Sequence, residues 1–330
     1  MDTAAIVILI AAALLFAYLN GFNDTSSIVA TMISSRAMPP RKALLLVAAG
    51  KLIGPFLFGV AVASTVGKGL IATDSLTGSA LLAGLLSAIT WNLIAWYFGL
   101  PSSSSHALLG GLIGASVGNA GFSSIQTSGL IKIVVSLVVT PVLVGAAGFV
   151  FMKILMFTVG KASPRINLFF KRAQLPTAFI LSLSHGTNDA QKTMGVIIMA
   201  LVALGYQEDF HVPLWTIAIS AAAISLGAAT GGWRIIRTVG GKFYKVRPVH
   251  AFSSQVCSAI IILSASLLGG PVSGTQVINS SVVAVGAGER FTKIRWDVAG
   301  NILLTWIITL PVTAILAMLF RLMTIHLLPR

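Results

Sequence analysis

The stretch NGFNDTSSI, residues Asn20–Ile28, interrupts a strongly apolar N-terminal segment with amide, carboxylate and hydroxyl side chains. A second polar stretch, SHGTNDAQK at Ser184–Lys192, interrupts another apolar run. Both stretches contain Gly-x-Asn-Asp, and Asp24 and Asp189 are separated by half of the 330 residues. We therefore expect two internal repeats, each with a carboxylate inside an apolar segment.

The composition excludes a water-soluble globular protein. The chain is 56% hydrophobic and 9% charged, with a mean hydropathy of +0.94, whereas soluble domains have about 25% charged residues. Most of the surface must therefore face lipid. The net charge is +14, but the basic residues cluster in short connections rather than on one face, so we expect no nucleic-acid partner. The single cysteine, Cys257, excludes an intrachain disulfide.

Apolar runs dominate the chain, and a membrane-spanning helix needs about 20 such residues. No alternation of strand type competes with these runs. The fold class that we predict is an all-α polytopic membrane protein with two inverted-topology repeats, interrupted helices, about five crossings in each repeat and 10–12 transmembrane segments. The expected domains are residues 1–160, a connection at 161–175, and residues 176–330. The runs are 4–35, 43–66, 79–98, 105–117, 130–159, 177–204, 214–233, 251–268, 275–285 and 298–328, with interruptions at Asn20–Asp24 and His185–Asp189.

The charges of the connections predict the orientation in the membrane. Arg36–Lys42, Lys161–Arg172 and Arg234–Arg247 are basic, whereas the connection that contains Glu208 and Asp209 is acidic. Lys and Arg mark cytoplasmic loops. We therefore expect an integral plasma (inner) membrane protein with both termini outside and the central connection in the cytoplasm. An odd number of crossings in each half makes the two halves inverted.

A second pair of stretches supports the repeat. GLPSSSSH at Gly99–His106 matches GGPVSGTQ at Gly269–Gln276, with proline and hydroxyl residues at corresponding positions. Two inverted repeats with interrupted helices at matching positions point to a secondary transporter and its binding site.

The two aspartates are candidate ligand-binding groups, because a carboxylate at mid-membrane costs at least a few kcal/mol and usually has a function. The alternative is that Asp24 and Asp189 cap the helices that follow. A broken helix exposes carbonyl groups, which together with Asn and Asp oxygens suit a hard cation. We therefore expect cation binding at Asn23, Asp24, Asn188 and Asp189.

The serine-rich turns place hydroxyl groups after a proline and before an apolar helix. Such a helix N-terminus has spare N–H donors and suits a tetrahedral oxyanion. The alternative is a turn in which the hydroxyls only cap the helix. No P-loop is present, so no nucleotide is expected.

Other polar residues in the apolar runs allow more than one interpretation. His106 and His185 either shuttle protons or form hydrogen bonds at helix ends. Lys192 neutralises Asp189, contacts an anion or extends to the interface. Lys51 and Lys132 are expected to be interfacial anchors.

GFNDTSSIVATMISS and SHGTNDAQKTMGVI resemble the paired signatures of the inorganic phosphate transporter (PiT) family. PSSSSHALLG, PVSGTQVINS and GAGERFTKIRW are also similar to that family, so the resemblance covers essentially the whole chain. It implies a phosphate symporter, coupled to sodium in some members and to protons in others. Gln276 stands where the family usually has histidine, and Gly274 replaces a common hydroxyl residue. The central connection, Lys161–Gln174, is short, whereas some members have a long hydrophilic domain.

From the residues and the resemblance together we predict a phosphate permease that is not an enzyme. It has no cofactor apart from sodium as co-substrate, bound at Asp24 and Asp189, with the proton as the alternative. Further partners are membrane lipid and, as an assembly to test, a homodimer. The predicted phosphate-binding residues are Thr25, Ser26, Ser103, Ser104, Ser105, Ser273, Gly274 and Thr275; secondary candidates are His106, Thr187, Lys192 and Gln276.

Electrostatics predicts the coupling, because two ionised aspartates beside phosphate repel it. Like charges about 5 Å apart repel by roughly 3 kcal/mol at an effective dielectric constant of 20. Three alternatives remain at this stage: a permease for sulfate or another oxyanion, an intramembrane hydrolase that uses Ser103–Ser105, His106 and an aspartate, and a passive channel.

Overall fold

A computed structural model describes residues 3–71, 77–159, 163, 165–236 and 244–324. Residues 161–162 and 164 of the expected central connection, residues 237–243 of another basic connection, and residues 325–328 of the last expected run lie outside the described residues. The helices of the first half are α1 (Thr3–Ser34), α2 (Pro40–Ile53), η1 (Gly54–Phe56), α3 (Ala61–Gly69), α4 (Gly78–Phe98), α5 (Ser104–Ala120), η3 (Phe122–Ser124) and α6 (Thr127–Val159). Those of the second half are α7 (Ile166–Ala203), α8 (Leu214–Thr230), α10 (Pro248–Leu267), α11 (Gly274–Glu289), η4 (Phe291–Lys293) and α12 (Trp296–Thr324).

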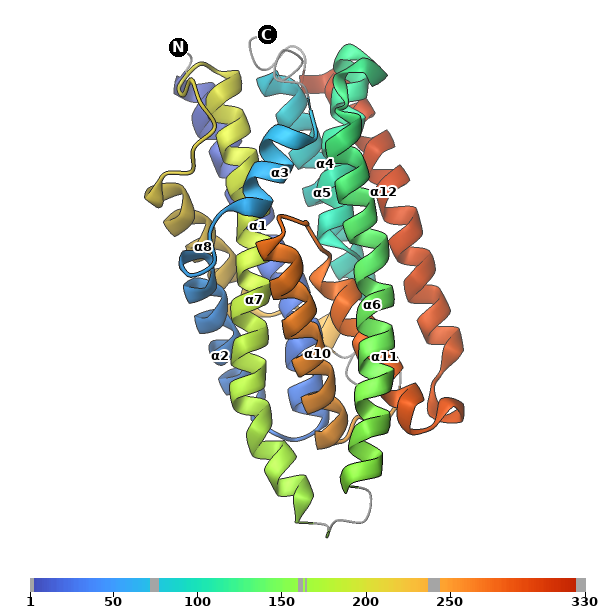
Figure 1. Cartoon of the computed structure of the whole chain (residues 1–330). Helices are drawn as coiled ribbons and strands as arrows, with labels where there is room; N and C mark the ends of the chain where they lie inside the picture. The colour runs from blue at the N-terminus through green and yellow to red at the C-terminus, as the bar shows by residue number, and fades with distance from the viewer. Residues whose placement is uncertain (1–2, 72–76, 160–162, 164, 237–243, 325–330) are drawn as a thin grey trace.

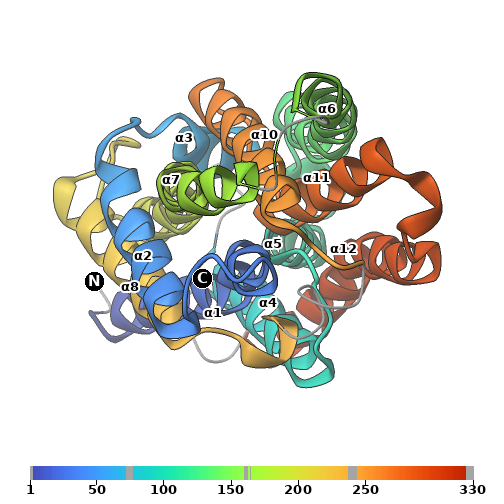
Figure 2. The same cartoon turned by 90° about the horizontal axis from the view of Figure 1, so that it is seen from below.

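The two halves have opposite directions in the bundle. The first residue of α1 and the last residue of α12 lie at one end, whereas the end of α6 and the start of α7 lie at the other (Figure 1). Seen along the bundle, α1 and α7 lie side by side near the centre, close to α5 and α11 (Figure 2). The expected all-helical fold of two inverted repeats is confirmed.

The uninterrupted course of α1 and α7 corrects one expectation. Both helices run through the Asn-Asp stretches, over 32 and 38 residues respectively, so the expected breaks at Asn20–Asp24 and His185–Asp189 are wrong. The glycines of these stretches serve close packing instead. A Cβ on Gly21 would overlap the backbone of Ile224 in α8, and one on Gly186 would overlap the backbone of Lys51 in α2.

The interruptions lie at the proline turns. Helix α4 ends at Phe98 and is capped by Gly99, which has a φ of 65°, and α10 is followed by Gly269 with a φ of 72°. These left-handed conformations favour glycine and reverse the chain. Helices α5 and α11 then begin at mid-height and run to opposite ends of the molecule (Figure 1). The pairs α4–α5 and α10–α11 are therefore helical hairpins that enter from opposite ends.

The lengths of the helices agree with this architecture. Helices α5 and α11 contain 17 and 16 residues, fewer than the about 20 that cross a membrane. The expected runs 105–117 and 275–285 are thus half-helices. Among the described residues, five helices are long and apolar enough to cross a membrane, or up to six if the bent pair formed by residues 40–56 and α3 is one span.

A polar layer divides the apolar core at mid-height. Along α1, Leu9, Phe16 and Leu19 belong to one apolar cluster, and Ile28, Val29 and Met32 belong to another. Along α7, Val196–Leu201 belong to the first cluster and Ala178 and Leu181 to the second. The residues between these segments carry the Asn-Asp stretches, so the fold places both aspartates between the two apolar clusters.

The packing role of Gly186 predicts a difference between two identical substitutions in helices. Gly186→Ala should lower the thermal stability of the purified protein, because overpacking typically costs about 1–3 kcal/mol. Gly145→Ala is the matched control, since a Cβ on Gly145 of α6 meets no atom within 4 Å, and alanine favours a helix by about 0.5–1 kcal/mol. Melting of both variants in detergent, followed by size-exclusion chromatography, measures the difference. Equal melting temperatures would contradict close packing at Gly186.

Candidate functional site

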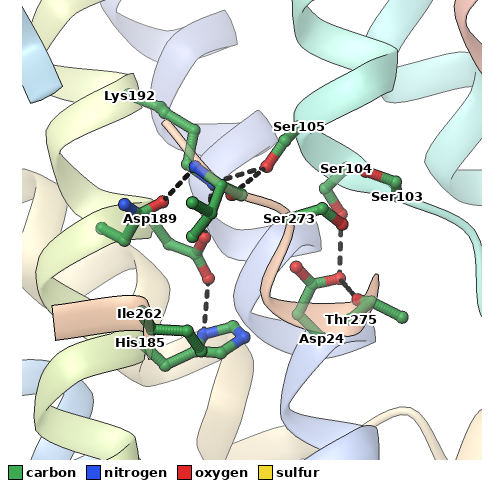
Figure 3. A network of polar contacts seen from close by, with 12 residues as sticks. Asp24, Ser103, Ser104, Ser105, His185, Asp189, Lys192, Ile262, Ser273 and Thr275 are labelled. Atoms are coloured by element: carbon green, nitrogen blue, oxygen red, sulfur yellow. Dashed lines mark hydrogen bonds and ion pairs between the residues drawn. The ribbon is translucent and has the colours of Figure 1, made fainter. Parts of the chain in front are cut away.

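The candidate site lies where α1, α2, α7 and the tips of the two hairpins meet. The side chains of Asp24 and Asp189 are 2% and 1% exposed. A carboxylate with so little access to water needs partners within the protein. The two aspartates meet this need in different ways (Figure 3).

Asp189 is surrounded by nitrogen-bearing side chains. Lys192 Nζ lies 2.7 Å from Asp189 Oδ1, and His185 Nδ1 lies 2.7 Å from Oδ2. Both partners come from α7, because residues four before and three after an aspartate share its face of a helix. Lys51 Nζ of α2 lies 3.6 Å from Oδ2. The Asp189 carboxylate therefore lies between two ammonium groups, whose combined charge exceeds its own.

The position of Lys51 corrects the expectation that it anchors the protein at the interface. Lys51 is fully buried, because Gly50 and Gly54 allow α2 to pack closely against Ser182 and Leu183 of α7. The sequence does contain a feature that indicates a role in the site: Lys51 lies within the apolar run 43–66, and ionisable residues inside membrane segments are usually functional. Lys132 is exposed, in agreement with the expected position of an anchor, and its Nζ donates to Thr65 Oγ1 over 3.3 Å.

Lys192 connects α7 to both hairpin tips. Besides Asp189, its ammonium donates to Ser105 Oγ at 2.6 Å and to the carbonyl of Val272 at 2.9 Å. Ser105 Oγ in turn donates to the Val272 carbonyl at 2.9 Å. An ammonium has three donors, so these bonds satisfy Lys192 completely. Of the interpretations considered for this residue, neutralisation of Asp189 is confirmed, and its complete burial excludes an interfacial position.

Asp24 has hydroxyl partners instead of ammonium partners. Ser104 Oγ and Thr275 Oγ1 donate to Asp24 Oδ1 at 3.1 and 2.9 Å. Ser104 and Thr275 lie in the first turns of α5 and α11, and helix N-termini stabilise negative charge. None of the ion pairs among the described residues includes Asp24.

The two repeats form one site rather than two distant ones. Carboxylate oxygens of Asp24 and Asp189 and a ring nitrogen of His185 all lie within 4.8 Å of one another. Lys51 and Lys192 both pair with Asp189, so two ammonium groups and two carboxylates share this centre. The geometry thus provides a nearly neutral centre beside two helix N-termini.

Ser103 and Ser273 act as helix caps. Ser103 Oγ accepts from the backbone N–H of His106 at 3.1 Å, and Ser273 Oγ accepts from that of Gln276 at 3.3 Å. Ser103 Oγ also bonds His106 Nδ1 at 2.7 Å. The capping interpretation of the turns is therefore correct for these two serines. His106 and Gln276 line a cavity of about 570 Å³ beside α6 and α12, and Gly274 lies against the ring of His185.

Asn188 holds the second hairpin in place. Its Nδ2 donates to Ser266 Oγ at 2.8 Å and to the Gly270 carbonyl at 3.2 Å, and its Oδ1 accepts from the N–H of Val272 at 3.2 Å. In the first repeat, Asn23 Nδ2 donates to the carbonyl of Asn92 at 3.0 Å. Both asparagines therefore join the central helices to the hairpins.

The remaining candidates make fewer contacts with the site. Ser26 Oγ donates to the Gly232 carbonyl at 3.0 Å, and Thr187 Oγ1 donates to the Leu183 carbonyl of its own helix at 2.8 Å. Thr25 Oγ1 is buried and has no hydrogen-bond partner among the described residues. Thr25 therefore has a hydroxyl to offer, whereas Ser26 and Thr187 are already engaged elsewhere.

Comparisons with known proteins agree with this architecture. The model of a family described as the phosphate transporter family matches residues 20–167 and again residues 158–317. A probable low-affinity inorganic phosphate transporter of Bacillus subtilis is 41% identical over 314 residues, which is 94% of each chain. A protein of the same name from Rhizobium meliloti is 42% identical over 317 residues, also 94% of each chain.

A solved structure titled the sodium-dependent phosphate transporter has the same fold. It is 23% identical in sequence and superposes with a TM-score of 0.89, covering 99% of this chain and 100% of the other. The double match of the family model agrees with the two repeats in the structure.

The contacts of Asn188 predict a loss of stability on truncation. Asn188→Ala removes three hydrogen bonds and leaves the buried N–H of Val272 without its partner, and each unsatisfied buried group costs about 1–3 kcal/mol. Thr187→Val is the matched control, because the Thr187 hydroxyl donates to a carbonyl of its own helix. Thermal unfolding in detergent should show a clearly lower melting temperature for Asn188→Ala alone. A wild-type melting temperature for that variant would show that the amide does not hold the hairpin.

Proposed function

This chain belongs to the phosphate transporter family, and from that premise we propose that it imports inorganic phosphate by symport with a cation, sodium being favoured and the proton the alternative. It is an integral membrane transporter and not an enzyme. Membership of this family argues against the three alternatives that the sequence alone left open, namely a hydrolase, a channel and a sulfate permease.

The observation that carries the proposal is the pair of hydroxyl bonds to Asp24. Ser104 and Thr275 come from the two hairpins and donate to the same carboxylate oxygen, at 3.1 and 2.9 Å. Their donors are thus directed at an aspartate that has no ion-pair partner among the described residues. A cation bound at Asp24 neutralises the carboxylate. The hydroxyls of Ser104 and Thr275 are then free to donate hydrogen bonds to an incoming anion.

Phosphate is proposed to bind beside the N-termini of α5 and α11. Free N–H groups of the first turn and the helix dipoles favour an anion there. The hydroxyls proposed as ligands are those of Ser104, Ser105, Thr275 and Thr25, whereas Ser103 and Ser273 contribute as caps. Lys51 adds a buried ammonium without a hydrogen-bond partner among the described residues.

Charge balance supports the coupling. Asp24 and Asp189 are offset by Lys51 and Lys192, so phosphate brings an excess of one or two negative charges into a buried site. One such repulsion across about 5 Å costs roughly 3 kcal/mol at an effective dielectric constant of 20, which is about two decades in affinity. A cation at Asp24, with Asn23 beside it, removes that excess, and phosphate then binds only when the cation does.

The orientation in the membrane is also part of the proposal. We place the protein in the plasma (inner) membrane with both termini outside and the α6–α7 connection in the cytoplasm, because exposed basic residues such as Arg36, Arg165 and Arg295 belong to connections at that end. The proposed domain boundaries remain 1–160, 161–175 and 176–330, although α7 already begins at Ile166. Membrane lipid surrounds the apolar faces of α6 and α12, and a homodimer remains the assembly to test.

The cation role of Asp24 predicts the behaviour of two variants. Asp24→Asn keeps the side-chain volume and removes the charge, so the protein should fold while cation-driven phosphate uptake is largely lost. The proposed phosphate site predicts a second effect: Thr275→Val should weaken phosphate binding several-fold, because one hydrogen bond contributes about 1 kcal/mol. Labelled phosphate uptake into proteoliposomes under imposed sodium or proton gradients measures both effects.

The control for charge removal is Asp297→Asn. Asp297 is 66% exposed and pairs only with Arg295 among the described residues, so its loss should leave uptake unchanged. Cation-driven uptake at the wild-type rate by Asp24→Asn would disprove the cation role.

The proposed orientation predicts which residues a membrane-impermeant thiol reagent can reach. In a Cys257→Ser background, Glu208→Cys should be labelled from outside intact cells, whereas Lys245→Cys should be labelled only after the membrane is opened. Both positions are exposed, and they belong to connections at opposite ends of the bundle (Figure 1). The reverse pattern would invert the proposed orientation.

A further inference from the structure

The two halves differ in the residues that surround the two aspartates. Four residues before each aspartate stands Asn20 in the first half and His185 in the second, and three residues after it stands Ser27 in the first half and Lys192 in the second. These positions lie on the same helix face as the aspartate. The two halves therefore share the aspartate but differ in the residues beside it on the helix face.

The third neighbour of Asp189, Lys51, also lacks a charged counterpart. Gly54 packs against the backbone of Leu183, and Gly227 makes the same contact with Tyr18 in the other half. Lys51 and Ile224 each lie three residues before these glycines. Ile224 is fully buried and apolar, so all three positions that carry basic or imidazole groups around Asp189 are neutral around Asp24.

Lys192 has the ligand set of a bound cation. Its ammonium contacts a carboxylate oxygen of Asp189 at 2.7 Å, the hydroxyl of Ser105 at 2.6 Å and the carbonyl of Val272 at 2.9 Å. Carboxylate, hydroxyl and unwound-backbone carbonyl oxygens are also the groups that coordinate coupling ions in transporters. No donor of Lys192 remains for phosphate, since all three are used.

The first repeat contains counterparts of these groups, and among the described residues no ammonium forms an ion pair with Asp24. Thr275 corresponds to Ser105, and the carbonyl of Ser102 corresponds to that of Val272. The Ser27 hydroxyl and both atoms of the Asn20 amide are buried and have no hydrogen-bond partner among the described residues. These oxygen atoms on the aspartate's own helix face are suited to a small exchangeable cation.

We propose that Lys192 is a tethered cation that permanently takes the place of a mobile one at Asp189, so that each chain binds a single exchangeable sodium ion, at Asp24. This inference rests on the proposed function and departs from the sequence-based expectation of a second sodium ion at Asp189. Lys51 lies farther from the carboxylate, at 3.6 Å from Asp189 Oδ2, and does not occupy the position among Asp189, Ser105 and Val272 that Lys192 fills. The sequence repeat alone implies two cations for each phosphate, one at each aspartate, whereas the inference leaves one.

The number of sodium ions bound by the purified protein tests the inference. Equilibrium binding of radioactive sodium to the full chain in lipid nanodiscs, without phosphate, should give one saturable site in the wild type. Asp24→Asn should give none, and Lys192→Met should give two, because methionine keeps the length of the side chain and removes the ammonium. Lys132→Met, which removes a lysine hydrogen-bonded to Thr65, is the matched control and should keep one site.

The reciprocal variant avoids dependence on the folding of Lys192→Met. Ser27→Lys places an ammonium beside Asp24, and the folded variant should bind no sodium. One site retained in folded Ser27→Lys, or one site in folded Lys192→Met, would overturn the inference.

The wild-type count separates the failure of this inference from that of the proposed function. Two sites in the wild type would overturn the tethered cation alone and leave sodium-coupled transport intact. No site would overturn both the sodium site at Asp24 and sodium coupling, whereas phosphate uptake would be measured independently in proteoliposomes.

Discussion

The structure depends on the burial of two carboxylates in a protein whose surroundings are mostly lipid. An uncompensated carboxylate in such an interior is costly, so each aspartate determines what must be packed around it. Asp189 requires α2 to bring Lys51 close to α7, and Gly50, Gly54 and Gly186 make that approach sterically feasible. Asp24 requires both hairpin tips, because its two hydroxyl partners come from α5 and α11.

The hairpins solve a second problem, the presentation of helix N-termini inside a membrane. A full-length helix has its N-terminus at the membrane surface, whereas α5 and α11 begin at mid-height (Figure 1). Their caps Ser103 and Ser273 satisfy part of the exposed backbone, and Asn188 holds the turn before α11. The inverted repeat places these two N-termini near each other from opposite directions, as the common contact with Asp24 shows.

Duplication of the halves and divergence of their residues have different consequences. The duplicated elements, namely the aspartates, the proline turns and the capped half-helices, place oxygen and nitrogen groups around one centre. The diverged positions, Ser27 against Lys192 and Asn20 against His185, set the charge on each side of that centre. A site built from two repeats is thereby electrostatically asymmetric.

The amino-acid sequence by itself determined the class of the protein, the twofold repeat and the identity of the aspartates and serine turns. Composition excludes a water-facing surface, and polar residues repeated at half the chain length are visible without any coordinates. Only the tertiary structure decided where the helices are interrupted and which groups meet. Asp24 and Thr275 are 251 residues apart, and Lys51 reaches Asp189 from another helix. Local pattern predicts that a side chain is polar in an apolar segment, but its partner depends on helix packing, which is why α1 and α7 continue through stretches that resemble breaks.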